Sequence, residues 1–228
     1  MKKLFTPLEK ATDKVGGGKD IDTDGGLMPP SAPLERNFLT GFTIIVIALI
    51  SFIILKPAWT EEPGLQGIEF LIGFAEGKLE QKKDYHLATL FVDFDFNIKP
   101  LTKKINFNPP SLVQFQLEPF FSLATQPEDN LEAGVSFLFK LGLLPETWKF
   151  QPYIKGGAGM IYITQHTIEQ STQFNFIPSY AAGLHYFFKQ DTALTLEYRY
   201  RHLSNASIKS PNSGIDVDFL IAGITRLF

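Results

Sequence analysis

The stretch TALTLEYRYRHLSN, residues 192–205, alternates apolar and polar side chains along its length. One face carries Leu194, Leu196, Tyr198 and Tyr200, and the other carries Thr195, Glu197, Arg199 and Arg201. A period of two is the pattern of a β-strand, in which successive side chains point to opposite faces. At the end of this strand His202 and Ser204 share the parity of the leucines and tyrosines. The strand is therefore predicted to carry two reactive polar groups on its apolar face.

Seven further segments alternate in the same way: 66–79, 85–98, 112–125, 130–144, 150–164, 174–188 and 215–228. Each is long enough to cross a bilayer as a tilted strand, which needs about 9–11 residues. Most of the polar connections between the segments are short, which predicts antiparallel neighbours. An even number of antiparallel strands closes without edges. The sequence thus predicts an all-β fold, an eight-stranded antiparallel transmembrane β-barrel, over residues 64–228.

Charges of both signs occupy the middle of the predicted strands: Glu118, Lys155, Glu197, Arg199 and Arg201. Such groups can pair inside a small barrel while the apolar face, rich in the 22 phenylalanines of the chain, meets lipid. The alternative is a soluble eight-stranded barrel of lipocalin type, with the phenylalanines filling its interior. Long strands and short connections favour the transmembrane form. The terminal aromatic residue, Phe228, is also typical of outer-membrane barrels.

The N-terminal part of the chain differs in composition from the predicted barrel. Residues 1–37 are rich in Gly, Asp, Lys and Pro and are predicted to be disordered. Residues 38–58 contain an uncharged apolar run that fits either the core of a removable signal peptide or a retained membrane anchor. Met28 is an alternative start that would shorten the leader. With either interpretation, the chain after about residue 60 is predicted to be exported.

Composition excludes several classes of site. The chain has no cysteine, which excludes disulfides and thiolate metal sites, and its net charge of −3 gives no reason to expect a nucleic-acid partner. The dispersed histidines lack metal-ligand spacing and are interpreted as structural or loop residues: His86, His166 and His185. The glycine-rich stretch 156–159 predicts close packing within a strand. Lysine pairs at 82–83 and 103–104 are interpreted as solvated loop charges, with contact to lipid phosphates as the alternative.

His202, Ser204 and Asp216 have the residue types and spacing of a serine esterase site. Side chains at i and i+2 of a strand project from one face about 6.6 Å apart along it, so the Ser204 hydroxyl can reach the imidazole of His202. Asp216 lies early in the next antiparallel strand, where it can orient the imidazole. Asp218 shares the parity of Asp216 and is the second candidate for that role. The strand order places these residues at the external rim, facing the outer leaflet.

The stretch RHLSNASIKSPNSGID, residues 201–216, resembles the PagL-type lipid A 3-O-deacylases, which are outer-membrane β-barrels. The family pattern is His-x-Ser-Asn-Ala, then a Pro-Asn-x-Gly loop, then an acidic residue. The matching residues are His202, Ser204, Asn205, Ala206, Pro211, Asn212 and Gly214, with Asp216 in the acidic position. The resemblance implies Ser204 as the nucleophile, His202 as the general base and Asp216 as the orienting group. It also implies that Asn205 and Asn212 support the oxyanion site.

Three features depart from the family pattern, and one of them is an N-terminal region longer than a plain signal peptide. The orienting residue of the family is usually glutamate, whereas Asp216 is shorter by one C–C bond, about 1.5 Å. The connection 99–111 is also long for a periplasmic turn.

The resemblance implies metal-free removal of the 3-O acyl ester of lipid A in lipopolysaccharide, in the outer membrane of a Gram-negative bacterium. The implied partners are lipid A and outer-membrane lipids, with no cofactor, no metal and no nucleic acid; a homodimer is compatible with this interpretation. The competing hypothesis is a non-enzymatic barrel, structural or adhesive, with a degenerate site.

Overall fold

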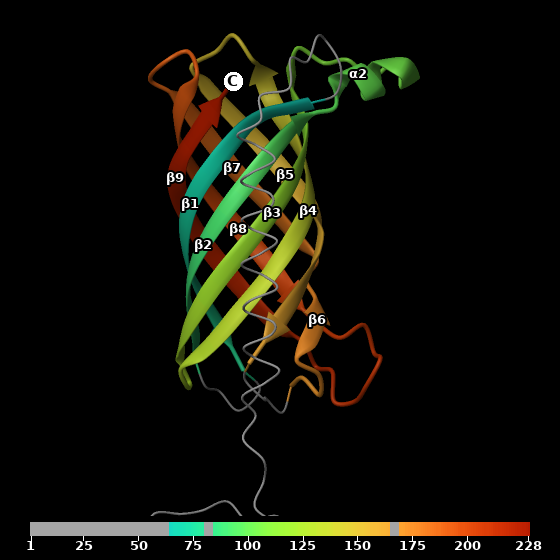
Figure 1. Ribbon diagram of the computed structural model, residues 1–228, viewed down its shortest axis with the longest axis vertical. Coiled ribbons are helices and arrows are strands. Elements are labelled where there is room, and N and C mark those ends of the chain that lie inside the picture. Colours follow the sequence, from blue (N-terminus) through green and yellow to red (C-terminus); the bar gives the residue numbers. More distant parts are fainter. Residues whose placement is uncertain (1–63, 80–83, 165–168) are drawn as a thin grey trace, which may run out of the picture. The chain divides into compact units, whose positions relative to one another are not determined.

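The computed structural model describes residues 64–79, 84–164 and 169–228, whose strands close into a barrel (Figure 1). The strands are β1 (Gly64–Lys78), β2 (Asp84–Asn97), β3 (Ser111–Gln126), β4 (Asn130–Pro145), β5 (Phe150–Ile163), β6 (Phe174–Phe176), β7 (Ser179–Phe187), β8 (Thr192–Leu203) and β9 (Ile215–Leu227). Two helical turns, α2 (Lys99–Thr102) and η1 (Lys103–Ile105), connect β2 to β3. The predictions for residues 1–37 and 38–58, and for Met28, lie outside the described residues. Within the described ranges, no helix has the length and apolar character needed to cross a membrane.

The strands pair antiparallel in chain order, and the ladder between β1 and β9 joins the first strand to the last. The remaining ladder, between β4 and β5, completes the ring. β6 and β7 both pair with β5, along successive stretches of it, and so form one interrupted strand. The barrel therefore has eight antiparallel strands, and the predicted fold class is confirmed.

The structure differs from the prediction in dividing the segment 174–188 at Ile177 and Pro178. Proline has no N–H to donate to a β-ladder, so regular pairing stops there. Ile177 still exchanges two backbone hydrogen bonds with Gly159, at 2.9 and 3.1 Å. The Pro178 carbonyl accepts a hydrogen bond from the backbone N–H of His202 at 3.0 Å. The wall of the barrel thus continues across the break, directly beside the predicted catalytic strand.

Ion pairs fill the middle of the barrel interior. The guanidinium of Arg199 binds both carboxylate oxygens of Glu118, with each N–O distance 2.6 Å. The ammonium of Lys155 lies 2.9 Å from the Glu197 carboxylate and 3.2 Å from that of Asp93. All five side chains belong to buried residues. Charge-assisted pairs of this kind satisfy groups that would be very unfavourable if buried alone.

Between the ion pairs and the rim that carries the loop after β8, an apolar cluster fills the end of the interior nearest the predicted site. Its larger members include Leu71, Phe91, Phe120, Ile161, Ile177, Leu203, Ile215, Phe219 and Ile221. Leu203 lies between His202 and Ser204 in the sequence, and Ile215 precedes Asp216. Because their side chains are anchored in this cluster, the alternate positions on the two strands are held on the outer face.

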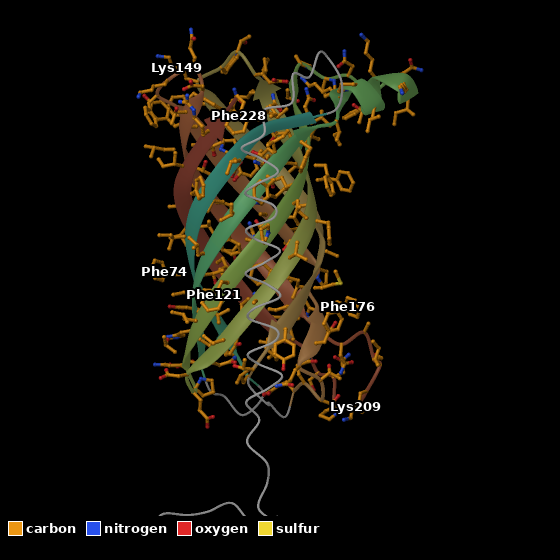
Figure 2. The ribbon with its side chains drawn as sticks, in the orientation of Figure 1. Phe74, Phe121, Lys149, Phe176, Lys209 and Phe228 are labelled. Atoms are coloured by element: carbon orange, nitrogen blue, oxygen red, sulfur yellow. The ribbon has the colours of Figure 1, made fainter. Side chains whose placement is uncertain are left out.

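The outer face of the barrel is apolar. Leu196, Tyr198 and Leu220 are 52%, 55% and 62% exposed, and Phe74, which projects from the wall in Figure 2, is 67% exposed. A soluble barrel would place these side chains inside and the charges outside. The distribution is the reverse, as a membrane-spanning barrel requires, so the lipocalin-type alternative is excluded.

Replacing Lys155 with methionine is predicted to destabilise the barrel strongly. The substitution leaves Asp93, Glu118 and Glu197 with one cation fewer in a buried site, and removing one partner of a buried ion pair costs about 3–5 kcal/mol. The measurement is the free energy of unfolding in urea, in detergent or vesicles, followed by fluorescence and gel mobility.

Lys209→Met is the matched control, because Lys209 is exposed in the loop between β8 and β9. It is expected to unfold at the urea concentration of the wild type. An unchanged midpoint for Lys155→Met would show that the interior pairs do not support the fold.

Candidate active site

The ladder between β8 and β9 brings His202 and Asp216 directly opposite each other. The imidazole Nδ1 lies 2.6 Å from Asp216 Oδ1, so the ring N–H donates a hydrogen bond to the carboxylate. Both side chains are on the outer face, where that of His202 is 35% exposed and that of Asp216 is 60% exposed. In a neutral imidazole this bond favours the tautomer with its proton on Nδ1, which leaves Nε2 as the nitrogen that can accept a proton.

The two candidate carboxylates differ in their partners. Asp218 accepts a hydrogen bond from the hydroxyl of Tyr198 at 2.6 Å, one step further along the ladder. Asp216, by contrast, binds His202 and has the hydroxyl of Tyr200 as a second hydrogen-bond partner. Tyr200 was not among the predicted site residues, although its parity with His202 could have indicated it. The carboxylate beside the imidazole is therefore held from two sides.

Ser204 follows the end of β8 and lies beside β6. Its backbone N–H donates to the Phe176 carbonyl at 3.0 Å, and the Phe176 N–H donates to the Ser204 carbonyl at 2.7 Å. Phe176 and Ser204 therefore form a hydrogen-bonded antiparallel pair, which extends the ladder past Pro178. The pair keeps Ser204 on the same face as His202. Within the described part of the chain, the Ser204 hydroxyl has no hydrogen-bond partner, so it is available to a ligand or to the imidazole.

Gly214 packs against the imidazole of His202. A Cβ at this position would lie 2.4 Å from the ring Cε1 and 3.0 Å from Nε2, which leaves no space for a larger residue. Its φ of +83° is also a left-handed conformation that glycine adopts without strain. The glycine of the family pattern thus has two physical reasons here, one in the backbone and one in the space beside the ring.

Asn205 and Asn212 are joined by a hydrogen bond, and they differ in whether their side-chain N–H groups are engaged. The backbone N–H of Asn205 donates to Asn212 Oδ1 at 2.7 Å. The side-chain amide of Asn205 is turned into the loop, where it donates to Ser171 Oγ and to the Lys209 carbonyl at 3.1 and 2.8 Å. In the described residues, the amide N–H groups of Asn212 have no partner. Asn212 thus presents a free donor, whereas the amide donors of Asn205 are engaged.

A segment before β6 supports the loop that carries Asn212 and Gly214. The Ser171 N–H donates to the Pro211 carbonyl at 3.1 Å, and the Ser213 N–H donates to the Glu169 carbonyl at 3.0 Å. These bonds attach the loop 204–214 to a second connection at the same rim. No sequence pattern indicated this support, because the two segments are about forty residues apart.

The other histidines in the described ranges, His86 in β2 and His185 in β7, lie outside this arrangement. His185 is buried inside the barrel, where its Nδ1 lies 2.9 Å from the Thr195 hydroxyl. His166 lies outside the described residues. Within the described ranges, no group of three or more His, Asp or Glu side chains is placed to hold a metal ion.

Similarity to known proteins extends across these residues. A family model described as lipid A 3-O-deacylase (PagL) matches residues 104–225, more than half of the chain. The chain is similar to the crystal structure of the outer membrane enzyme PagL, with a TM-score of 0.50 and 16% identity over 67% of this chain and 97% of that one. It is also similar to Neisserial surface protein A, with a TM-score of 0.55 and 11% identity over 74% of this chain and 100% of that one. No curated protein sequence matches the chain.

The two structural likenesses concern the fold alone, because both identities are low. An enzyme and a surface protein share it, so the barrel does not by itself distinguish catalysis from another role. The family match carries more weight for the site, because its span includes residues 202–216.

Asp216→Asn is predicted to remove the downfield proton signal of the His202 ring N–H in ¹H–¹⁵N spectra of histidine-labelled protein. The reason is that an amide is a weaker acceptor than a carboxylate for this hydrogen bond. Asp218→Asn is the control, since Asp218 binds Tyr198 and not the imidazole. A signal that disappears in Asp218→Asn and persists in Asp216→Asn would contradict the assignment of Asp216.

Proposed function

The chain belongs to the lipid A 3-O-deacylase (PagL) family, and from this premise we propose that it removes the 3-O-linked acyl chain of lipid A by serine esterase chemistry. It is a β-barrel of the Gram-negative outer membrane, and its family acts on lipid A. The observation that carries the proposal is the hydrogen bond of 2.6 Å between His202 and Asp216 on the lipid-facing side of the barrel.

In the proposed reaction, Ser204 Oγ attacks the carbonyl carbon of the ester while His202 Nε2 takes the hydroxyl proton. The tetrahedral intermediate collapses as the bond from the carbonyl carbon to the sugar oxygen breaks. His202 returns its proton to that oxygen, which leaves a free 3-hydroxyl on the sugar. Water then attacks the acyl-enzyme with His202 again acting as base, and the fatty acid leaves. Asp216 stabilises the imidazolium formed in both steps.

We assign the oxyanion donor to Asn212 and a supporting role to Asn205. The amide N–H groups of Asn212 are free in the described structure, and its oxygen is fixed by the backbone N–H of Asn205. A donor held in place before reaction lowers the energy of the developing oxyanion without reorganisation. Because the side-chain N–H groups of Asn205 bind the loop, Asn205 acts by holding Asn212.

The rim that carries the site is assigned to the outer leaflet. Both ends of the described barrel, Gly64 and Phe228, lie at the opposite rim, together with α2. In outer-membrane barrels with an even number of strands the ends share one side, and the longer loops are external. The described residues 169–173 before β6 and the loop 204–214 lie at the rim of the site. At the opposite rim the connections between β4 and β5 and between β7 and β8 are short, and the one between β2 and β3 is the exception. Lipid A, which forms the outer leaflet, would then reach Ser204 laterally.

An apolar hollow on the outer face fits the acyl part of such a substrate. The hollow is open to the surroundings, with a volume of about 630 Å³, and includes Phe139, Ile154, Tyr180 and Tyr198 in its lining. Tyr180 stacks on Tyr200 at a centroid distance of 4.9 Å, which joins the hollow to the residues beside His202. A chain lying there would extend from the ester towards the centre of the bilayer.

The proposal is tested by expressing the protein in a bacterium whose lipid A carries a 3-O-linked hydroxyacyl chain and analysing that lipid A by mass spectrometry. The wild type is expected to remove one such chain. Ser204→Ala and His202→Ala are each expected to slow the reaction by about 10⁴-fold or more, because they remove the nucleophile and the base.

Ser210→Ala is the matched control, since Ser210 is an exposed serine of the same loop and has no proposed role in the reaction. It is expected to behave as the wild type, provided that all variants reach the outer membrane as folded barrels. Intact lipid A with the wild type, or full activity of both site variants, would contradict the proposal. Either result would favour a structural or adhesive barrel with a degenerate site.

A further inference from the structure

The connection between β2 and β3, residues 98–110, presents apolar side chains at the rim opposite the site. We call this segment the β2–β3 arm; it contains α2 and η1. Leu101, Ile105 and Phe107 are 49%, 75% and 43% exposed. At 13 residues the arm is long for a periplasmic turn, and it uses that length to carry three large apolar side chains outside the barrel.

The charge of the arm has one sign. It holds Lys99, Lys103 and Lys104 and no aspartate or glutamate. Lys99 pairs with Glu146 in the turn between β4 and β5, and this ion pair fixes the base of the arm. Lys103 and Lys104 are exposed, and neither has an ion-pair partner within the described part of the chain. Two cations therefore lie among apolar side chains without a protein carboxylate to neutralise them.

The arm lies at the rim of the barrel, beside the turn between β4 and β5. Its last residues are held to the turn between β4 and β5, because the Glu146 N–H donates to the Pro110 carbonyl at 3.1 Å. Figure 1 shows α2 projecting sideways from the rim rather than over its opening. Trp148, in the same turn as Glu146, is 55% exposed, and Figure 2 places Lys149 at this end of the barrel. Exposed aromatic and basic residues together are typical of a membrane–water interface.

We propose that the β2–β3 arm is an interfacial anchor that binds the glycerophospholipids of the periplasmic leaflet. Leu101, Ile105 and Phe107 enter the boundary between headgroups and acyl chains, and Lys103 and Lys104 bind lipid phosphates. A short segment with apolar side chains and unpaired cations, extended laterally from a membrane-spanning wall, fits this environment better than water. The inference uses the barrel and its rim and is independent of the chemistry at Ser204.

The test places a single tryptophan in the arm and measures its contact with lipid. Trp59 and Trp148, the two tryptophans of the chain, are replaced with phenylalanine, and Ile105→Trp supplies the reporter. The full chain is folded into vesicles of phosphatidylcholine and phosphatidylglycerol with or without lipids brominated near the headgroup end of the acyl chain. The emission of the reporter is expected to shift to the blue and to fall at least two-fold with the brominated lipid.

The control reporter is Gln190→Trp in the turn between β7 and β8, an exposed position at the same rim. It is expected to lose less than half as much of its emission as the arm reporter. Because the arm meets a leaflet whichever way the barrel inserts, mixed orientation in vesicles does not obscure the result. Emission at position 105 that is typical of water and unchanged by brominated lipid would overturn the proposal. That result would mean that the apolar side chains of the arm contact a periplasmic protein or solvent and not lipid.

The charges are tested separately with Lys103→Gln and Lys104→Gln combined in the arm-reporter protein. Quenching is expected to increase with the phosphatidylglycerol fraction in the parent and to lose that dependence in the double variant. Lys209→Gln, at the opposite rim, is the matched control and should retain it. If the double variant keeps the dependence, the lysines do not bind lipid phosphates. Barrel folding is checked for every variant by heat-dependent gel mobility, so a failure to fold is distinguished from a loss of contact.

Discussion

The need to satisfy every backbone hydrogen bond inside a bilayer is the constraint on which this structure depends. Hydrocarbon offers no partner to an unpaired N–H or carbonyl, so strands that cross it must close into a ring. Closure by the β1–β9 ladder fixes the register of all strands, and register fixes which side chains face lipid. The ion pairs inside and the apolar residues outside are two consequences of the same alternation. The position of His202 and Ser204 on the lipid side is a third.

Register also explains how an aspartate can stand where the family usually has glutamate. His202 and Asp216 are direct cross-strand partners, and side chains in such pairs lie close together. The shorter carboxylate therefore reaches Nδ1 at 2.6 Å without a long side chain. Gly214 packs against the His202 ring and restricts its position. The Tyr200 hydroxyl binds the Asp216 carboxylate and restricts that side chain. An aspartate in place of the usual glutamate is therefore compatible with the geometry that orients a general base.

The strand pattern of the fold could be predicted from sequence because a period of two is visible in each strand alone. The partners within the barrel could not, since Arg199 and Glu118 are 81 residues apart and meet only through the closed register. For the site, the local motif indicated His202, Ser204 and Asp216 as candidates. It did not indicate that the Asn205 amide turns inward to Ser171, because that contact depends on a loop distant in sequence. The continuation of the wall across Pro178 could not be predicted either, because it depends on the hydrogen bonds between Ile177 and Gly159 of the neighbouring strand.

The proposed function requires that His202 activates a serine on the lipid-facing side of the barrel. The most direct measurement is covalent labelling of the full-length protein in a bilayer with a long-chain alkyl fluorophosphonate, a probe that partitions into lipid and reacts with activated serines. Peptide mass spectrometry then identifies the modified residue. We expect one adduct, on Ser204, that is absent in His202→Ala, with Ser210 unmodified. An unmodified Ser204 in the wild type, or equal labelling of Ser204 without His202, would contradict the proposed function.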